Sequence, residues 1–177
     1  MRTTPKSVID AAQKIKLLLL DVDGVLTDGK LYYGNSGEEL KGFDIQDGLG
    51  IKLLQKGNIQ VGIITGRMSS LLQRRADELG ISPVVQGRED KLTALNELLP
   101  SLDITLDEIA FIGDDLPDLA LIKRVGLGIT VANASSTLAA EANWQTVSTG
   151  GNGAVREVAE MILTVQEKFS GIVGQYQ

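Results

Sequence analysis

The sequence predicts a doubly wound α/β domain, in which helices cover both faces of a mainly parallel sheet. Short apolar runs rich in Leu, Ile and Val alternate along the chain with segments of helical pattern. Glycine or proline closes most of the helical segments. Strands that alternate with helices of roughly ten residues imply right-handed crossovers, which place the strands parallel in one sheet.

The apolar runs are the predicted strands. Each run is short and bounded by turn-forming or charged residues, as is typical of strands buried in a parallel sheet. The predicted strands are residues 15–20, 59–64, 83–85, 109–112, 127–131 and 144–147.

One segment, residues 30–43, breaks the alternation. It contains LYYGNSGEEL, with Gly34, Asn35 and Gly37 near its centre. Turn residues of this kind between two short strand-like stretches favour a β-hairpin. We therefore expect a hairpin inserted after the first strand, and it could project from the body of the domain.

The helical segments carry recognisable faces and ends. Leu72, Ala76 and Leu79 share one face of a helix that Gly80 terminates. Pro117 fits the first turn of a later helix, where its missing N–H costs nothing. The predicted helices are residues 48–56, 69–79, 91–99, 116–125 and 153–168.

Composition narrows the chemistry that the chain can perform. The net charge of −6 gives no broad basic surface for nucleic acid. The chain has no cysteine and no histidine, which excludes thiolate chemistry, histidine-dependent triads and histidine-ligated zinc. Carboxylates combined with a hard cation such as Mg²⁺ are the natural remaining set, and this set suits phosphoryl groups.

The expected setting is a soluble, cytoplasmic protein without a membrane partner. The apolar run 17–20 ends at Asp21, and the start MRTTPKSVID lacks the apolar core of a signal peptide. The length fits a single domain over residues 1–177 with the hairpin insertion at about 30–43. On composition, the tail 170–177 is expected to be loosely ordered.

Two carboxylates follow the first predicted strand in the motif DVDG. Asp21 and Asp23 are two residues apart, so on an extended chain both side chains point to the same side. Asp21 is the candidate nucleophile towards phosphorus, and Asp23 is the candidate proton shuttle. The alternative is that both aspartates only cap the turn at Gly24.

Polar residues also follow the second strand and begin a later helix. The Thr65 hydroxyl and the backbone at Gly66 could hold a phosphate oxygen, although a Thr-Gly pair is often only a turn. Arg67 could bind an anionic group of a substrate or stand in solvent. Lys91 could neutralise charge at the site. Its position alone favours a solvated lysine beside Glu89 and Asp90.

An acidic cluster, GDDLPD, follows the fourth strand. Asp114, Asp115 and Asp118 repel one another unless a cation or solvent relieves the repulsion. Asp114 is the first candidate for a metal ligand and Asp118 is the next. Because ligands bind beyond the carboxyl ends of parallel strands, all these residues are expected on one rim.

In order and spacing, DVDG, ITGR, the lysine and GDDLPD resemble the four motifs of haloacid dehalogenase-type phosphatases. Together with GNSGEELKGF, DGLGI and GGNGAVREV, they are similar to the 3-deoxy-D-manno-octulosonate 8-phosphate phosphatases. The resemblance implies a Rossmann-like domain without a large cap. It also implies hydrolysis of a phosphorylated sugar acid to the free sugar acid and phosphate, within lipopolysaccharide biosynthesis.

The resemblance also implies roles for individual residues. Asp21 would form an aspartyl phosphate and Asp23 would act as acid and base. Asp21, the backbone carbonyl of Asp23, and Asp114 would bind Mg²⁺. Thr65 and Lys91 would bind the phosphate. From their positions alone, Gly66 and Arg67 are further candidates for substrate contacts, and Asp115 and Asp118 are candidates for a place behind the metal ligands.

By the same resemblance, the chain assembles as a homotetramer in which the hairpin of one subunit closes the site of a neighbour. The alternative is a hairpin on a monomer. Residues 150–156 would form a loop near the site. Gln46 departs from the family, because many relatives carry a basic residue there. The end of the chain, FSGIVGQYQ, also departs from the usual tail.

Other functions share parts of this pattern. A phosphatase for a sialic acid 9-phosphate or another phosphosugar would carry the same four motifs. A receiver-like binding module controlled by phosphorylation would also combine an acidic cluster, a threonine and a lysine. In such modules the acceptor aspartate follows the third strand, whereas here that strand leads into QGRED.

Overall fold

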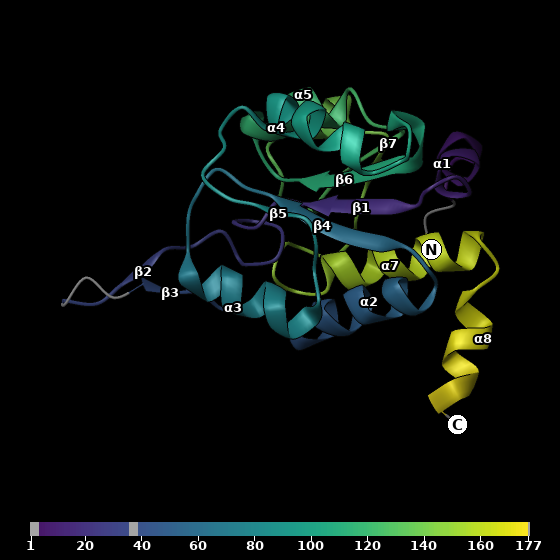
Figure 1. Ribbon diagram of the computed structural model, residues 1–177, viewed down its shortest axis with the longest axis horizontal. Coiled ribbons are helices and arrows are strands. Elements are labelled where there is room, and N and C mark those ends of the chain that lie inside the picture. Colours follow the sequence, from purple (N-terminus) through teal and green to yellow (C-terminus); the bar gives the residue numbers. More distant parts are fainter. Residues whose placement is uncertain (1–3, 36–38, 177) are drawn as a thin grey trace.

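The computed structural model describes residues 4–35 and 39–176. Its main sheet has the strand order β5-β4-β1-β6-β7-β8, and every pair is parallel (Figure 1). The winding reverses at β1, which lies between β4 and β6, and ligands bind beside such a point in doubly wound sheets. The predicted fold class is confirmed. The strands are β1 (Leu17–Leu20), β4 (Gln60–Ile64), β5 (Val84–Val85), β6 (Ile109–Gly113), β7 (Leu127–Thr130) and β8 (Trp144–Gln145).

Helices cover both faces of the sheet (Figure 1). One face carries α2 (Ile45–Lys56), α3 (Ser70–Leu79) and α7 (Ala154–Val165), and the other carries α4 (Lys91–Leu98), α5 (Leu119–Ile122) and α6 (Ser136–Glu141). In the part of the chain that the structure describes, no helix is long and apolar enough to cross a membrane.

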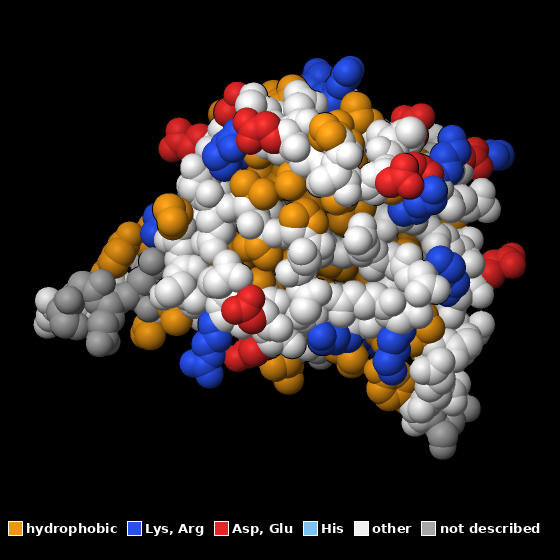
Figure 2. Space-filling view, in the orientation of Figure 1, with side chains coloured by type: hydrophobic (Ala, Val, Ile, Leu, Met, Phe, Trp, Pro, Cys, Tyr) orange, Lys and Arg blue, Asp and Glu red, His pale blue; other side chains and the backbone are white. Residues whose placement is uncertain are grey.

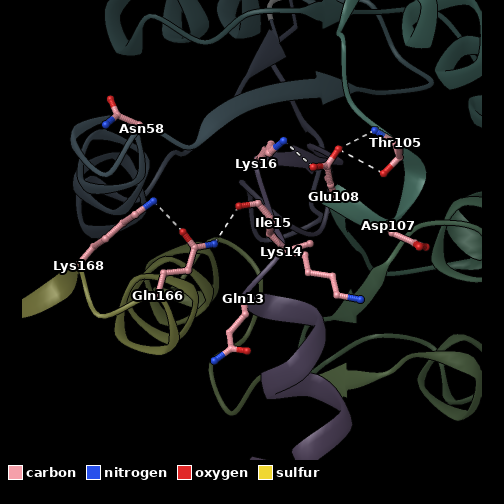
Figure 3. Close-up of a pocket in the computed structure, with 10 residues that line it drawn as sticks. All are labelled: Gln13, Lys14, Ile15, Lys16, Asn58, Thr105, Asp107, Glu108, Gln166 and Lys168. Atoms are coloured by element: carbon pink, nitrogen blue, oxygen red, sulfur yellow. Dashed lines mark hydrogen bonds and ion pairs between the residues drawn. The ribbon is translucent and has the colours of Figure 1, made fainter.

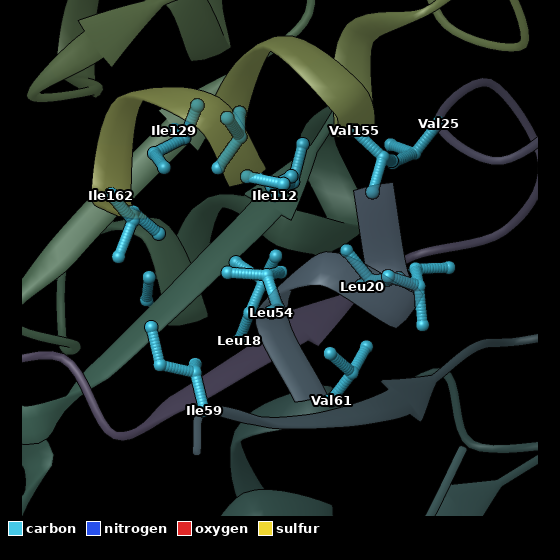
Figure 4. Close-up of a cluster of buried hydrophobic side chains, with 14 of the residues drawn as sticks. Leu18, Leu20, Val25, Leu54, Ile59, Val61, Ile112, Ile129, Val155 and Ile162 are labelled. Atoms are coloured by element: carbon cyan, nitrogen blue, oxygen red, sulfur yellow. The ribbon is translucent and has the colours of Figure 1, made fainter. Parts of the chain in front are cut away.

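The core has two parts because side chains on each strand alternate between the faces. On β1, Leu18 and Leu20 belong to the cluster under α2 and α7, whereas Leu17 and Leu19 belong to the cluster under α4 and α5. Figure 4 shows the first cluster, where Leu54 of α2 faces the strands. Each of these fully buried leucines stabilises the fold by about 1.5–3 kcal/mol.

Several predicted helix boundaries were wrong. Helix α2 begins three residues earlier than predicted, because the Asp44 side chain accepts hydrogen bonds from the N–H groups of Gln46 and Asp47. The predicted helix 116–125 is a 3₁₀ turn, η3 (Leu116–Asp118), followed by α5. The last helix was predicted over residues 153–168, and α7 is shorter, since it spans Ala154–Val165.

Some elements were missed. Helix α1 (Lys6–Ala12) buries Val8 and Ala12, and α6 begins after Ser135, whose side chain caps it. The expectation of a loosely ordered tail was wrong. Helix α8 (Phe169–Val173) and η4 (Gly174–Tyr176) continue the chain, and Ile172 is buried in the core. Two further 3₁₀ turns are η1 (Leu99–Ser101) and η2 (Leu106–Glu108).

A second, small sheet lies where the hairpin was expected. Strands β2 (Tyr32–Tyr33) and β3 (Glu39–Leu40) pair antiparallel, with Tyr32 opposite Leu40. Figure 1 shows this pair projecting from the body of the domain. Residues 36–38, at the predicted turn, lie outside the described residues.

Candidate active site

Pairing of β1 with β6 brings Asp21 close to Asp114. The Asp21 N–H donates to the carbonyl of Ile112 at 3.0 Å, so Asp21 extends the ladder just beyond β1. Asp21 is only 7% exposed. At Gly24 the backbone has φ +95°, and a Cβ there would overlap the carboxylate of Asp114. The turn after β1 therefore lies directly against the acidic loop after β6.

Asp118 organises that acidic loop. One of its carboxylate oxygens accepts hydrogen bonds from the N–H groups of Asp114 (2.9 Å) and Asp115 (3.3 Å). Its other oxygen accepts from Lys91 Nζ at 2.5 Å. Asp21, Asp114 and Asp118 each place an oxygen within 4.8 Å of the others. Because both Asp118 oxygens already have partners, Asp21 and Asp114 are the carboxylates best placed for a cation.

Lys91 lies inside the cluster and is not a solvated lysine. It is the first residue of α4 and is only 3% exposed. Its Nζ is 2.9 Å from Asp21 Oδ1, and the ring centroid of Phe111 lies 5.9 Å away. Burial alone would lower the pKa of Lys91, but Asp21 and Asp118 raise it above its usual value. The lysine therefore remains charged.

The cluster holds more negative than positive charge. Burial first, and then repulsion from Asp118, raises the pKa of Asp21 to about 6 despite the opposing effect of Lys91. Burial, followed by repulsion from Asp21 and Asp118, raises the pKa of Asp114 to about 7. Three carboxylates around a single lysine create an environment that favours binding of a further cation.

Asp23 faces the same cleft between two basic side chains. Lys41, from the segment after β3, forms an ion pair with one carboxylate oxygen, and Arg67 Nε lies 3.6 Å from the other. The Lys41 side chain is almost completely buried. The sequence did not single out Lys41, since nothing local indicates that the projecting segment returns to the site.

The predicted residues converge on one open cleft at the carboxyl edge of the sheet. Thr65 is buried directly after β4, where its N–H donates to the carbonyl of Val85 at 3.0 Å. Asp115 accepts from the N–H of Leu116 and so caps η3. Glu89 and Pro117 also line the cleft and were not predicted as site residues. The predicted lining residues are Asp21, Asp23, Thr65, Gly66, Arg67, Lys91, Asp114, Asp115 and Asp118.

The glycine-rich loop before α7, residues 150–153, lies beside this cleft, whereas residues 154–156 of the predicted loop are the first turn of α7. The Gly151 N–H donates to the carbonyl of Val25 at 2.9 Å. A Cβ on Gly150 would overlap the carbonyl oxygen of Gly24. The loop therefore packs on the turn at Gly24, which follows Asp23 in the chain and contacts Asp114.

Another hollow lies at the amino edge of the sheet (Figure 3). There Lys16 pairs with Glu108 at 2.5 Å, and Gln166 donates to the carbonyls of Ala12 and Ile15. Its drawn contacts join side chains to one another and to the backbone, and no group of three or more possible metal ligands was found there among the described residues.

Comparison with known proteins identifies the family of this chain. Residues 84–158 match the family model of haloacid dehalogenase-like hydrolases. The 3-deoxy-D-manno-octulosonate 8-phosphate phosphatase KdsC of Yersinia pestis is 48% identical over 94% of this chain and 89% of its own length. The KdsC protein of Escherichia coli K12 is 46% identical over 95% of this chain and 89% of its own. The chain belongs to the 3-deoxy-D-manno-octulosonate 8-phosphate phosphatase family of haloacid dehalogenase-like hydrolases.

A solved structure of this family is also similar in detail. The phosphatase from Moraxella catarrhalis, in complex with a magnesium ion, a phosphate ion and KDO, has a TM-score of 0.94 and 48% identity. The match covers 96% of this chain and 98% of that protein. A protein from Xanthomonas campestris, with a TM-score of 0.96 and 38% identity, covers 100% of this chain and 97% of its own. The family resemblance inferred from the motifs is therefore confirmed.

Proposed function

We propose that this chain is a magnesium-dependent phosphatase that hydrolyses 3-deoxy-D-manno-octulosonate 8-phosphate to the free sugar acid and phosphate. The observation that carries the proposal is the buried Asp21, held 2.9 Å from Lys91 in the cleft that also contains Asp23 and Asp114. The relative from Moraxella catarrhalis, which binds magnesium, phosphate and KDO, supports the choice of substrate at 48% identity.

The donor atoms fit a magnesium ion. Asp21 and Asp114 offer hard carboxylate oxygens. Burial first, and then repulsion between the carboxylates, raises their pKa values to about 6 and about 7, and a divalent cation would offset that repulsion. The backbone carbonyl of Asp23 is the third proposed protein ligand. Bound there, the ion would neutralise charge on the phosphoryl oxygens.

In the proposed reaction, a carboxylate oxygen of Asp21 attacks phosphorus, and the bond between phosphorus and the sugar oxygen breaks. Asp23 donates a proton to that oxygen, and an aspartyl phosphate remains on Asp21. Asp23 then accepts a proton from the water that attacks phosphorus, which releases phosphate and restores Asp21. Lys91 Nζ and the Thr65 hydroxyl bind the phosphoryl oxygens throughout.

The site also suggests how the sugar acid is bound. Arg67 is partly exposed at the rim, and its guanidinium reaches Asp23 while remaining accessible from the cleft. We assign it to an anionic group of the substrate, because a guanidinium binds carboxylates in a fixed geometry. Gln46 carries no charge, so it does not supply the cationic contact that many relatives have at this position.

We further propose a homotetramer in which residues 30–43 contact a neighbouring subunit. Tyr33 is 66% exposed and Leu40 is 65% exposed, and Figure 2 shows hydrophobic side chains on the projecting segment. Exposed apolar side chains grouped in this way favour a protein contact. Tyr33→Glu should reduce the mass measured by light scattering, and an unchanged tetramer or a monomeric wild type would refute this arrangement.

The substrate assignment is tested by phosphate release from 3-deoxy-D-manno-octulosonate 8-phosphate, a sialic acid 9-phosphate and a generic aryl phosphate, with Mg²⁺ and with chelator. We expect Mg²⁺-dependent preference for the first. Preference for the second or third would retain the chemistry and reject the substrate. No release from any of them would reject the phosphatase and favour a receiver-like module.

A further inference from the structure

Asp47 is a buried carboxylate that the proposed reaction does not use. It lies in the first turn of α2 and is 0% exposed. Its oxygens accept hydrogen bonds from the backbone N–H groups of Arg156 (2.9 Å) and Gly153 (3.3 Å). Burial raises the pKa of Asp47 to about 6, although those N–H groups act in the opposite direction. Burying a carboxylate is costly, so its position calls for an explanation.

The carboxylate caps a helix to which it does not belong. The N-cap residue of α7 is Gly153. Glycine has no side chain that could accept hydrogen bonds from the free N–H groups of the first helical turn. Asp47 supplies that acceptor from α2, and its negative charge also suits the positive end of the α7 dipole. The start of α7 is therefore fixed to α2.

The start of α7 is in turn connected to the active site through the glycine-rich loop. Gly150 and Gly151 immediately precede the capped turn and pack on the backbone of Gly24 and Val25. Gly24 also packs on the carboxylate of Asp114. A chain of close contacts therefore runs from the capped turn, through the backbone at Gly24, to the side chain of Asp114.

We propose that Asp47 is a positioning residue for the metal site, because it holds the glycine-rich loop against the Gly24 turn and so fixes the backbone of Asp23 relative to Asp114. This inference rests on the proposed function, since it assumes that Asp23 and Asp114 bind Mg²⁺. Asp47 itself does not line the cleft that contains Asp21, Asp23 and Asp114. Loss of the cap would leave the ligands present but less well placed.

The test is titration calorimetry with Mg²⁺ alone on the full chain and on Asp47→Asn. Asparagine keeps the shape but loses the charge, and it turns an N–H group towards a backbone N–H. We expect the dissociation constant to rise by about five-fold or more while circular dichroism stays unchanged. Equal Mg²⁺ affinity in the two proteins would overturn the inference.

A matched control removes another hydrogen bond between a side chain and the backbone, away from the Gly24 turn. Asn143 Oδ1 accepts from the N–H of Gly128 at 2.7 Å. Asn143→Ala should lower the unfolding temperature and leave Mg²⁺ affinity unchanged. A loss of affinity equal to that of Asp47→Asn would show that general destabilisation is responsible, which would also overturn the inference.

A second variant covers the case in which Asp47→Asn does not fold. Asn133 Oδ1 accepts from the N–H of Gly150 at 2.9 Å, so Asn133→Ala loosens the same loop from an exposed position. We expect a smaller rise of the dissociation constant in the same direction, and an unchanged value would overturn the inference. If the wild type itself binds no Mg²⁺, the proposed function fails instead.

Discussion

Both edges of the sheet carry lysines and carboxylates, but the balance between positive and negative charge differs between them. At the amino edge, Lys16 pairs with Glu108, and Lys168 donates to the carbonyl of Gly57 and to Gln166 (Figure 3). At the carboxyl edge, three carboxylates surround Lys91, and folding raises the pKa of two of them. At the amino edge, Lys16, Glu108 and Lys168 each have a partner within the chain, whereas carboxylates outnumber the lysine at the carboxyl edge.

This difference separates a structural polar cluster from a functional one. Paired surface charges contribute little to stability and need nothing further. Buried like charges destabilise the ligand-free fold, and they persist where a ligand relieves the repulsion. Substitutions at the carboxyl edge should therefore change catalysis and metal binding, whereas the same substitutions at the amino edge should change neither.

The largest effect is expected for Asp21→Asn. The amide cannot attack phosphorus, so kcat should fall by at least about 10³-fold, while the unfolding temperature stays close to that of the wild type. Steady-state phosphate release measures the loss. Asp10→Asn, at an exposed aspartate paired with Lys6, is the matched control and should retain full activity. Full activity in Asp21→Asn would contradict the assignment of the nucleophile.

Lys91→Met should affect both activity and stability. It leaves Asp21 and Asp118 buried without their cation, which should destabilise the fold by about 3 kcal/mol. The loss of charge near the phosphoryl group should lower kcat/KM by about 10²-fold. Urea unfolding and initial rates measure the two effects. Unchanged stability would show that Lys91 does not neutralise the cluster.

The pH dependence of stability should distinguish the ligand-free from the Mg²⁺-bound protein. Because the pKa values of Asp21 and Asp114 rise from 3.8 to about 6 and about 7, the folded state retains protons that the unfolded state has released. Without Mg²⁺, these two groups should lower the free energy of unfolding as pH rises from about 4 to about 7.

Mg²⁺ should therefore stabilise the protein more at about pH 8 than at about pH 5, since protons compete with the ion for both carboxylates. Thermal unfolding with and without Mg²⁺ measures the shift. Asp114→Asn is the control that should lose most of it. A shift of the same size at both pH values would be inconsistent with a site built on these carboxylates.

The smallest effect is expected at the amino edge. Lys16→Met breaks the ion pair with Glu108, in which the lysine is largely exposed, and should change the free energy of unfolding by less than about 1 kcal/mol. Activity and Mg²⁺ affinity should be unchanged. The same lysine-to-methionine change at Lys91 provides the comparison, and a similar loss of activity from both variants would remove the distinction between the edges.

The fold could be predicted from the sequence wherever hydrophobic periodicity was strong. Buried strands such as β1 and β6 are continuous apolar runs, which left little ambiguity. Short helices were missed because the seven residues of α1 and the six of α6 carry few periodic positions. The tail was misjudged because burial of Ile172 depends on contacts with distant parts of the chain.

The site residues at strand ends could also be predicted, because parallel strands bring their carboxyl ends together. Asp21, Thr65 and Asp114 are of this kind. Lys41 and Asp47 could not be predicted. Lys41 reaches Asp23 from the projecting segment, and Asp47 caps a helix 109 residues further along the chain. Such contacts depend on tertiary packing and leave no local signal.

The central claim, that Asp21 accepts the phosphoryl group, is tested most directly with Asp23→Asn and an aryl phosphate. An aryl leaving group needs no proton, so Asp21 should still be phosphorylated, whereas hydrolysis of the aspartyl phosphate should be slow without the base. We predict a rapid release of the aryl alcohol, close to one equivalent per chain, with the phosphoryl group on the peptide that contains Asp21. Continuous release at the wild-type rate, or a phosphoryl group on another residue, would contradict the mechanism.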